Sequence, residues 1–472
     1  MAFTEDQLVE QPAIQFLTDQ FAWQHVNCYS ESFGEAGTLG RASNNEVVLR
    51  SKLSAAVRRL NPELLELAVE QVVEEVSRDR SAMSSVEANR EVYQLVKEGV
   101  RVKITDPETQ QQEEVKAQLI DWKDPANNDF FLASQLTISG TYLTKRPDVI
   151  GFVNGLPLVL MEFKKPSVHV REGFDKNLTD YKESIPQLFH FNALLLVSNG
   201  VENKVGSLTS PWEHFNDWKK ASSEEELPAA TLENMLSGTC EPSRLLDLVE
   251  NYTLFSEKEG AVSKLVARNH QFLGVNRAVD ALEHSTNHQV GVFWHTQGSG
   301  KSYSMVFFAE KVFRKLRGNW TFVVITDRKE LDKQIYRTFA ACGAATDKKC
   351  HASSSANLKA LLRGDNRYVF TLIHKFNTNP GEAHPVLSER DDIIVLTDEA
   401  HRSQYDTLAM NMRTALPNAK FVAFTGTPLI TGEERTREVF GDYVSVYDFK
   451  QSVDDGATVP LFYENRTPEL EI

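Results

Sequence analysis

Three charged residues in the first half of the chain could form a metal-dependent nuclease site. Asp148 begins one apolar run, and Glu162 and Lys164 end the next, "LPLVLMEFK". Side chains of a strand alternate between its faces, so Glu162 and Lys164 point the same way. Two carboxylates at a strand pair can hold Mg²⁺ against a scissile phosphate, while a lysine orients the attacking water. The alternative is a strand whose terminal charges extend into solvent.

The turn between these runs decides whether Asp148 faces the other two charges. The sequence "VNG" indicates a hairpin. A two-residue turn at Asn154-Gly155 would leave Asp148 facing away from Glu162. A three-residue loop over 153–155, with Gly155 in a left-handed bulge, would gather all three charges on one face. We therefore predict the three-residue loop.

A second group of residues could bind a nucleotide. The stretch "HTQGSGKS" lies between an apolar strand pattern and an amphipathic helix pattern. Its glycines would let backbone N–H groups turn toward phosphate oxygens at a helix N-terminus. His295 occupies the first position, where the pattern GxxxxGK[ST] has glycine, and an ordinary glycine-rich loop is the alternative. The predicted nucleotide-binding residues are Thr296, Gly298, Ser299, Gly300, Lys301 and Ser302, with Ser302 also a magnesium ligand.

Two adjacent acids follow another apolar strand pattern in "DIIVLTDEAHRS". Burying unpaired carboxylates at a strand end is costly. A magnesium ion held by Asp398 and a water activated by Glu399 would give both acids a use. The alternative is a solvated strand-to-helix turn, where acids commonly cap the helix.

The elements that must position these groups change type along the chain. Residues 3–20 and 50–77 have helical spacing of apolar residues, and short β-rich runs between 99 and 164 predict a sheet. A helix pattern and the apolar run 193–200, typical of a buried strand, follow. From residue 289 onward strand and helix patterns alternate, which predicts a parallel sheet with helices on both faces.

Composition limits the class of protein. The chain has 472 residues, 41% of them hydrophobic, which is enough for two or three domains. Its four cysteines are too few and scattered for a disulfide framework. The formal net charge of −15 argues against polyanion binding over the whole surface but allows a local basic groove. Without an apolar run of about 18 residues or a signal-peptide pattern, we expect a cytoplasmic protein that does not enter a membrane.

Four motifs resemble those of superfamily 2 helicases and translocases: "HTQGSGKS", "VITDRKEL", "LTDEAHRS" and "FTGTPL" match motifs I, Ia, II and III in order. The resemblance implies phosphate and magnesium binding at Lys301 and Ser302, a magnesium ligand in Asp398 and a general base in Glu399. The residues that it implies for coupling ATP hydrolysis to DNA movement are His401, Thr425, Gly426 and Thr427.

The same resemblance suggests two further contacts. "ARNHQFLGVNRAV" resembles the adenine-reading Q motif, with Gln271 at the base edge, although an exposed glutamine is the alternative. Arg328 and Lys329 lie in motif Ia, where this family follows the DNA backbone. A solvated helix N-terminus is the alternative for that pair.

The first three charges resemble the PD-(D/E)xK nuclease pattern, here "PD" and "EFK", followed by a core helix and a buried strand. Many such nucleases carry Gln-x-x-x-Tyr in that helix, and this chain has Asn177 and Tyr181, which lie four residues apart. Glu10 stands where related nucleases can place another acid.

Taken together, the motifs resemble the R subunit (HsdR) of type I restriction enzymes. The resemblance implies an α/β chain: a PD-(D/E)xK nuclease domain with a mixed sheet flanked by helices (1–207), a helical connector (208–255), a RecA-like ATPase lobe (256–455) and the start of a second lobe (456–472). It implies an ATP- and Mg²⁺-dependent translocase and endonuclease that cuts double-stranded DNA far from its recognition site. Its partners would be methyltransferase and specificity subunits.

The absent second lobe would carry an arginine finger, so we expect poor ATP turnover. Two alternatives stay open at this point. One is a stand-alone nuclease-helicase in DNA repair or phage defence, and the other is an inert truncated subunit that only binds partners.

Overall fold

A computed structural model describes residues 6–105, 112–345, 350–377, 384–398, 405–428 and 434–459. The chain divides into two compact units, residues 1–272 with 341–343 and residues 273–340 with 344–472. The boundary at Phe272 falls inside helix α9. A compact unit does not show which segments fold alone, so the four-part division made from the sequence stays a prediction.

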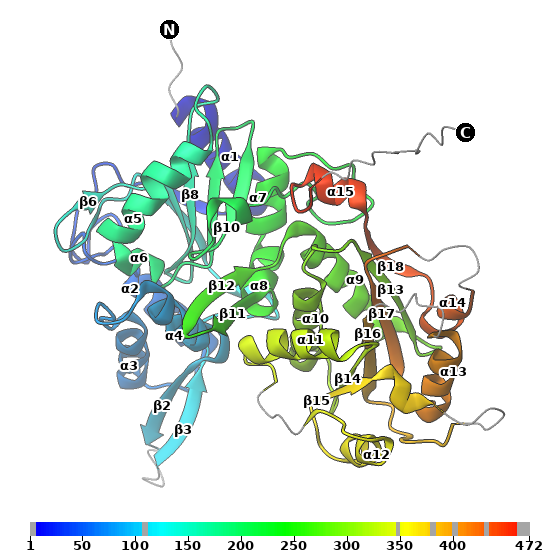
Figure 1. The fold of residues 1–472 in the computed structure, drawn as a ribbon. Coiled ribbons are helices and arrows are strands. Elements are labelled where there is room, and N and C mark those ends of the chain that lie inside the picture. Colours follow the sequence, from blue (N-terminus) through cyan, green and yellow to red (C-terminus); the bar gives the residue numbers. More distant parts are fainter. Residues whose placement is uncertain are drawn as a thin grey trace, which may run out of the picture. The chain divides into compact units, whose positions relative to one another are not determined.

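The first unit mixes helices and short strands (Figure 1). Its elements are η1 (Asp6–Glu10), α1 (Gln11–Phe21), β1 (Gln24–Asn27), α2 (Arg50–Leu60), α3 (Glu66–Ser77), α4 (Ser85–Glu98), β2 (Val100–Thr105), β3 (Gln112–Ala117), η2 (Pro125–Asn127), β4 (Phe130–Ser134), β5 (Ile138–Ser139), β6 (Thr144–Lys145), β7 (Val149–Val153), β8 (Leu156–Phe163), η3 (Gly173–Leu178), α5 (Thr179–Ser184), α6 (Pro186–Phe189), β9 (Leu194–Ser198), β10 (Asn203–Gly206), η4 (Trp212–His214), α7 (Leu232–Cys240), α8 (Pro242–Asn251), β11 (Thr253–Lys258), β12 (Ala261–Val266) and the start of α9 (Asn269–His284).

The main sheet of this unit has the strand order β1-β4-β7-β8-β9-β10. Strands β1 with β4 and β8 with β9 are parallel, and the other neighbours are antiparallel. The predicted mixed sheet is therefore confirmed. One expectation was wrong: β2 and β3 do not join this sheet but pair with each other, as do β11 and β12.

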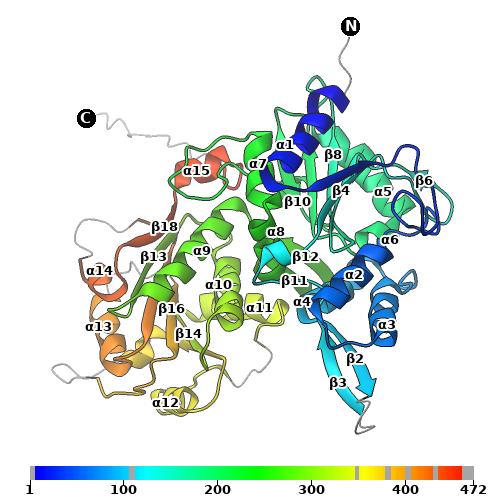
Figure 2. The same ribbon diagram turned by 180° about the vertical axis from the view of Figure 1, so that it is seen from behind.

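Helices cover both faces of this sheet. Gly173 at the start of η3 packs against Glu162 and Val197, so η3 and α5 lie over the face that carries Glu162. Trp23, which follows α1, packs against Gly151 on the opposite face and donates its indole N–H to Cys240 O of α7 at 3.0 Å. Figure 1 shows α5 in front of the sheet, and Figure 2 shows α1 in front.

The hairpin between β7 and β8 differs from the predicted three-residue loop. Val153 pairs with Leu156, so the turn has two residues, and Asn154 (φ 51°) and Gly155 (φ 82°) have the positive φ values of a type I′ turn. The register shifts once within β8, because Gly151 pairs with Val159 instead of residue 158. The prediction of the loop was wrong.

A bulge at Leu158 nevertheless brings Asp148 to the face of Glu162 and Lys164, as the predicted three-residue loop would have done. One extra residue in β8 moves the pairing so that Val149 faces Met161. The same register continued by one residue places Asp148 opposite Glu162. Pro157 lacks an N–H group for the ladder, which favours a bulge beside it. The Leu158 carbonyl instead accepts from Ala193 N at 2.7 Å, at the start of the next strand.

We predict that the turn depends on the side chain of Asn154, which is fully buried. Its amide donates to Leu119 O and Asn128 Oδ1, both at 2.8 Å, and accepts from Asp129 N at 2.8 Å and Arg59 Nη2 at 3.2 Å. Asn154→Ala should lower the stability of the first unit by about 4 kcal/mol, because buried polar groups lose partners. Urea denaturation measures the loss. Asn154→Gly removes the left-handed strain and serves as the companion, and an unchanged midpoint in both would contradict the prediction.

The second unit is built on a parallel sheet of order β15-β14-β16-β17-β13-β18. Its elements are the rest of α9, β13 (Gln289–His295), α10 (Lys301–Lys315), β14 (Thr321–Thr326), α11 (Lys329–Ala341), α12 (Ser355–Arg363), β15 (Tyr368–Leu372), η6 (Ile373–Phe376), β16 (Ile393–Asp398), α13 (Tyr405–Ala415), β17 (Lys420–Thr425), α14 (Glu434–Phe440), β18 (Tyr443–Tyr447) and α15 (Phe449–Asp454).

The strand side chains of this sheet alternate between two apolar layers, which explains the continuous apolar runs in the sequence. Val323 and Ile325 share a core with residues of α12, α13 and α14. Phe322 instead contacts Phe308 and Phe313 of α10. The predicted parallel sheet with helices on both faces is confirmed. No helix among the described residues is both long and apolar enough to span a bilayer.

Candidate nuclease and nucleotide sites

Asp148, Glu162 and Lys164 come together at the ends of β7 and β8. The carboxylate of Asp148 accepts from the backbone N–H of Phe163 at 2.8 Å, which fixes it against the end of β8. Lys164 Nζ lies 2.7 Å from Glu162 Oε1 and 2.7 Å from Phe163 O. Two acids and a lysine therefore converge at one edge of the sheet, as the sequence predicted, although the bulge at Leu158 brings them there.

The carboxylate of Glu162 is held in an unfavourable environment. Its side chain is 1% exposed, and its Oε2 is buried without a hydrogen-bond partner among the described residues. Burial first, and then repulsion by Asp148, raises the pKa of Glu162 to about 8, while Lys164 and the Tyr181 hydroxyl act in the opposite direction. Two acids that face each other at a buried strand end favour a cation between them.

The helix that follows β8 completes the wall around Glu162. Asn177 Nδ2 donates to the hydroxyl of Tyr181 at 3.3 Å, so the predicted pair does lie on one helix face. Burial and the nearby Glu162 raise the pKa of the Tyr181 hydroxyl, which keeps it a neutral hydrogen-bond donor. A Cβ atom on Gly173 would lie 2.7 Å from Val197 Cγ1 and 3.5 Å from Glu162 Cγ. Glycine at 173 therefore allows the helix to approach the acids.

Sequence reasoning missed Gln135, which links Glu10 to Asp148. Its backbone N–H donates to Asp148 O at 2.8 Å. Its side-chain amide donates to both oxygens of Glu10, at 3.0 and 3.2 Å. Gln135 has φ of 56°, a conformation that L residues rarely adopt. Glu10 is 3% exposed, so the opening helix contributes a buried acid to the side of the site that holds Asp148.

We predict that Gln135 positions Asp148 through this contact. Gln135→Gly keeps the left-handed backbone and removes the two hydrogen bonds to Glu10, and should lower the DNA cleavage rate about tenfold, comparable to the loss of one or two hydrogen bonds to a charge. Gln135→Ala is the companion variant, because it removes the same bonds but adds left-handed strain of about 1 kcal/mol. Plasmid nicking measures both. A rate equal to that of the unaltered chain would contradict the positioning role.

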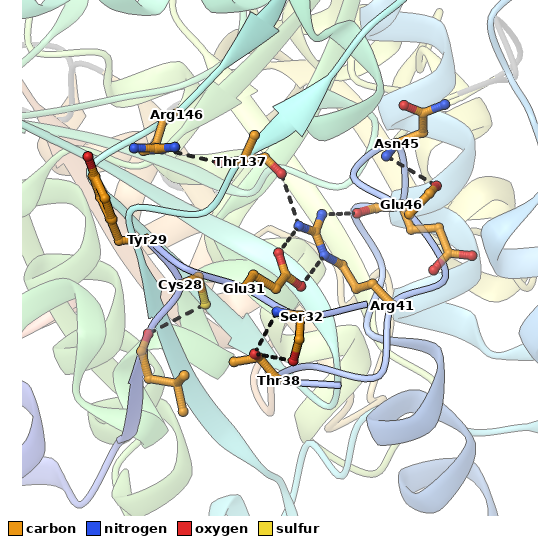
Figure 3. A network of polar contacts seen from close by, with 12 residues as sticks. Cys28, Tyr29, Glu31, Ser32, Thr38, Arg41, Asn45, Glu46, Thr137 and Arg146 are labelled. Atoms are coloured by element: carbon orange, nitrogen blue, oxygen red, sulfur yellow. Dashed lines mark hydrogen bonds and ion pairs between the residues drawn. The ribbon is translucent and has the colours of Figure 1, made fainter. Parts of the chain in front are cut away.

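A buried ion pair braces the segment that follows Gln135 (Figure 3). The guanidinium of Arg41 is buried, forms a bidentate pair with Glu31, and donates to Glu46 O at 2.6 Å and to Thr137 O at 2.9 Å. Removing one partner of such a pair typically costs about 3 to 5 kcal/mol. The irregular loop 28–49 therefore fixes the chain two residues beyond Gln135.

The residues at this edge of the sheet fit a divalent ion but supply only part of its coordination shell. Asp148 and Glu162 would be its carboxylate ligands, and when bound it would neutralise a scissile phosphate and activate water. No group of three or more His, Cys, Asp or Glu residues in the described part of the chain could hold a metal. Glu10 is thus not brought into a shared ligand set, and backbone carbonyls, waters and substrate would complete the coordination, as is usual for Mg²⁺.

The phosphate loop lies between β13 and α10, as predicted. Gly298 (φ 85°) and Gly300 (φ 88°) are left-handed, which turns the loop into the first turn of α10. Lys301 Nζ donates to His295 O at 3.0 Å and Thr296 O at 3.4 Å, so its ammonium lies inside the loop. The described groups fit a nucleotide phosphate at a helix N-terminus.

His295 takes the usual glycine position without strain because it is still part of β13. Its ring is fully buried, and its Nε2 lies 2.7 Å from Ser445 Oγ on the neighbouring strand β18. The backbone there pairs with Tyr447 in a regular parallel register. The tight turn begins after this residue, so a side chain is tolerated.

Asp398 and motif III end at the same sheet edge as the phosphate loop. Asp398 pairs with Phe424, which in turn pairs with Phe293, so the three lie in one row across β16, β17 and β13. Asp398 is 8% exposed. In motif III, Thr425 Oγ1 accepts from Thr427 N at 3.2 Å and donates to Thr427 O at 3.0 Å, which closes a tight turn at Gly426.

The remaining candidate residues lie at the start of α9, in motif Ia, in the phosphate loop and outside the described residues. Gln271 is 5% exposed, and its Oε1 accepts from Arg268 N at 2.9 Å at the start of α9, so the exposed-glutamine alternative was wrong. Arg328 and Lys329 are exposed, and Arg328 Nε lies 3.3 Å from Asp327. Ser299 is buried, and Ser302 lies in the first turn of α10. The predicted general base Glu399 and the predicted coupling residue His401 lie outside the described residues.

Comparison with known families agrees with both halves of this arrangement. Residues 2–214 match the family model of the type I restriction enzyme R protein N terminus, and residues 270–472 match that of the SWI2/SNF2 ATPase. The type I restriction enzyme HindI endonuclease subunit of Haemophilus influenzae is 39% identical over 460 residues. Residues 2–214 therefore resemble the N terminus of type I restriction enzyme R proteins, and nearly the whole chain is similar to an endonuclease subunit of such an enzyme.

Other relatives and solved structures match parts of the chain. The HindI subunit match covers 91% of this chain and 43% of that protein. A putative type I restriction enzyme MjaIXP endonuclease subunit of Methanocaldococcus jannaschii is 31% identical over 99% of this chain and 46% of its own length. A nuclease-deletion mutant of the type ISP enzyme LlaGI, solved with a DNA substrate mimic, has 16% identity and a TM-score of 0.31 over 40% of this chain and 20% of that one. The chain spans less than half the length of the curated relatives named.

Proposed function

We propose that this chain supplies the DNA-cutting site and an ATP-binding lobe of a type I restriction complex. The observation that carries the proposal is the convergence of Asp148, Glu162 and Lys164 beside the buried, unsatisfied oxygen of Glu162. The match of residues 2–214 to the R protein N terminus, the match of residues 270–472 to the SWI2/SNF2 ATPase and the phosphate loop support the same function. The substrate is double-stranded DNA, cut far from the recognition site, and the cofactors are Mg²⁺ and ATP.

In the proposed reaction, each protein group has a separate task. Asp148 is oriented by the Phe163 N–H and Glu162 by Lys164, so both carboxylates are preorganised for an ion and the phosphate that it binds. Lys164 Nζ can stabilise the charge that develops on the phosphate or orient the attacking water. Tyr181 lies on the helix side of the site, and its hydroxyl lowers the pKa of Glu162. In the motor, Lys301 would bind phosphate, Asp398 would hold magnesium, and Glu399 would act as the general base.

The proposed partners are a methyltransferase and a specificity subunit, which would select the DNA sequence. The two relatives named above are endonuclease subunits of type I restriction enzymes, which supports an assembly of this kind. The proposed location is the cytoplasm, where such a complex meets DNA.

Two measurements test the nuclease proposal. Mn²⁺ binding, followed by electron paramagnetic resonance, should be lost in Asp148→Ala, and Mg²⁺-dependent plasmid cleavage in the presence of ATP and both partner subunits should be lost in Lys164→Ala. Glu70→Gln is the matched control, because Glu70 is an exposed carboxylate on α3. Equal Mn²⁺ binding in Asp148→Ala and the unaltered chain, or cleavage that survives Lys164→Ala, would overturn the proposal.

A further inference from the structure

A short finger in the first unit ends in exposed hydrophobic side chains. Strands β5 and β6 pair over residues 138–145 and form this finger. At its tip Tyr142 is 93% exposed and Leu143 is 53% exposed. Large apolar side chains that protrude together from a surface typically mark a contact with another molecule.

The finger is held in place at its base, so the tip does not collapse onto the surface. Ser139 Oγ and Thr144 Oγ1 lie 2.7 Å apart across the two strands. Gln187 Nε2 donates to Ser139 O at 2.8 Å. A Cβ atom on Gly140 would lie 1.9 Å from Ser184 O, so the finger backbone lies directly against the end of α5.

The finger lies beside the candidate nuclease site. Lys145 Nζ pairs with Asp180 at 2.5 Å, and Asp180 immediately precedes Tyr181, which lies next to Glu162. Along the chain, Leu143 is five residues before Asp148 (148 − 143), a span of at most roughly 18 Å. That span corresponds to about five base pairs of B-DNA. A duplex bound at the acids is therefore long enough to extend to the finger.

The side chain of Arg146, which directly follows β6 at the base of the finger, stacks on an aromatic ring. The guanidinium of Arg146 lies 4.4 Å from the centroid of the Tyr29 ring, and its Nε donates to Thr137 Oγ1 at 3.1 Å (Figure 3). Both side chains are exposed. Arg146 is thus held in a fixed position two residues before Asp148, with its remaining N–H groups accessible to an anion.

We propose that this finger contacts duplex DNA next to the cut, with Tyr142 and Leu143 against the minor groove and Arg146 on a backbone phosphate. The inference rests on the proposed nuclease function. Apolar wedges beside arginine are a recurrent way to enter the minor groove, which is about 6 Å wide and admits a narrow tip. A protein partner is a poorer match, because a stable interface buries roughly 800 Å² per partner.

Binding of a fluorescein-labelled 30-base-pair duplex by the 472-residue chain tests the finger, with Ca²⁺ in place of Mg²⁺ to prevent cutting. The double variant Tyr142→Ala/Leu143→Ala should bind about tenfold more weakly, which is the scale of one lost stacking contact. Arg146→Gln should reduce the slope of log affinity against log salt by about 0.9, because one phosphate contact is lost. Leu227→Ala is the control, since Leu227 is an 89% exposed hydrophobic residue outside the finger.

The outcomes separate this inference from the nuclease proposal. Loss of Mn²⁺ binding in Asp148→Ala and loss of cleavage in Lys164→Ala test the nuclease proposal. The finger variants should keep Mn²⁺ binding. Unchanged duplex affinity in the double variant would overturn the finger contact and leave the nuclease proposal intact; the exposed tip would then belong to a protein contact. Failure of the unaltered chain to bind the duplex would overturn the finger contact as well.

Discussion

Replacing Glu162 with glutamine is expected to abolish DNA cleavage and, at the same time, to stabilise the protein. Glutamine fills the same space but cannot bind the metal as an anion, so the cleavage rate should fall by about a thousandfold or more, as when preorganised charge stabilisation is removed. Stability should rise most above pH 8, where the carboxylate is ionised while buried against Asp148. Most substitutions at a structural site would lower both quantities.

The pH dependence of this effect has a definite sign. The pKa of Glu162 is about 8 in the folded protein and close to the ordinary 4.5 when unfolded, so folding favours the protonated acid. This contribution to stability is complete below pH 4.5 and is lost as the pH rises through 8. Glu162→Gln should remove that loss, with a gain on the order of a few kcal/mol above pH 8.

Thermal denaturation at pH 5, 7 and 9, with and without Mg²⁺, measures both parts of the prediction. The melting temperature of the unaltered chain should rise on addition of Mg²⁺ at pH 9, and that of Glu162→Gln should not, because metal binding to the folded state is lost. Glu70→Gln again serves as the control. A variant that melts below the unaltered chain at pH 9 would show that the acid is not held under repulsion.

Replacing Lys301 with alanine is expected to cause the largest loss in nucleotide binding. Its ammonium lies inside the phosphate loop, where it donates to His295 O and Thr296 O and would exchange these carbonyls for phosphate oxygens. Loss of this charge-assisted contact costs about 3 kcal/mol, or roughly a hundredfold in affinity for ATP. Anisotropy of a fluorescent ATP analogue with Mg²⁺ measures the change.

Lys315→Ala provides the comparison for this variant, because Lys315 is an exposed lysine at the other end of the same helix. Lys301→Arg retains charge but replaces a compact ammonium with a planar fork, and should recover only part of the affinity. ATP binding by Lys301→Ala that equals that of Lys315→Ala would show that the loop does not bind phosphate.

The sequence alone was sufficient for most of the second unit. Buried parallel strands have continuous apolar runs, and a phosphate loop needs glycines and a lysine at fixed spacing. Both features can therefore be predicted from the sequence. The position of His295 could be explained only with coordinates. It depends on Ser445, which is 150 residues away in the chain and forms the hydrogen bond that accommodates the ring.

In the first unit, residue types determined which groups would act, and tertiary structure decided how they meet. Alternation along β8 placed Glu162 and Lys164 on one face, because that rule depends only on the local backbone. The side on which Asp148 falls depends on the bulge at Leu158, whose carbonyl bonds to Ala193. Pro157 was the one local sign of that bulge.

The roles of Gln135 and Arg41 could not be predicted from the sequence. Each acts through partners distant in the chain, Gln135 through Glu10 and Arg41 through Thr137, and neither stands in a pattern with a period or motif. Local spacing therefore determined the chemistry that this chain carries, because strand and loop geometry repeat over a few residues. Long-range hydrogen bonds decided the register and support of the site, because those contacts exist only once the chain has folded.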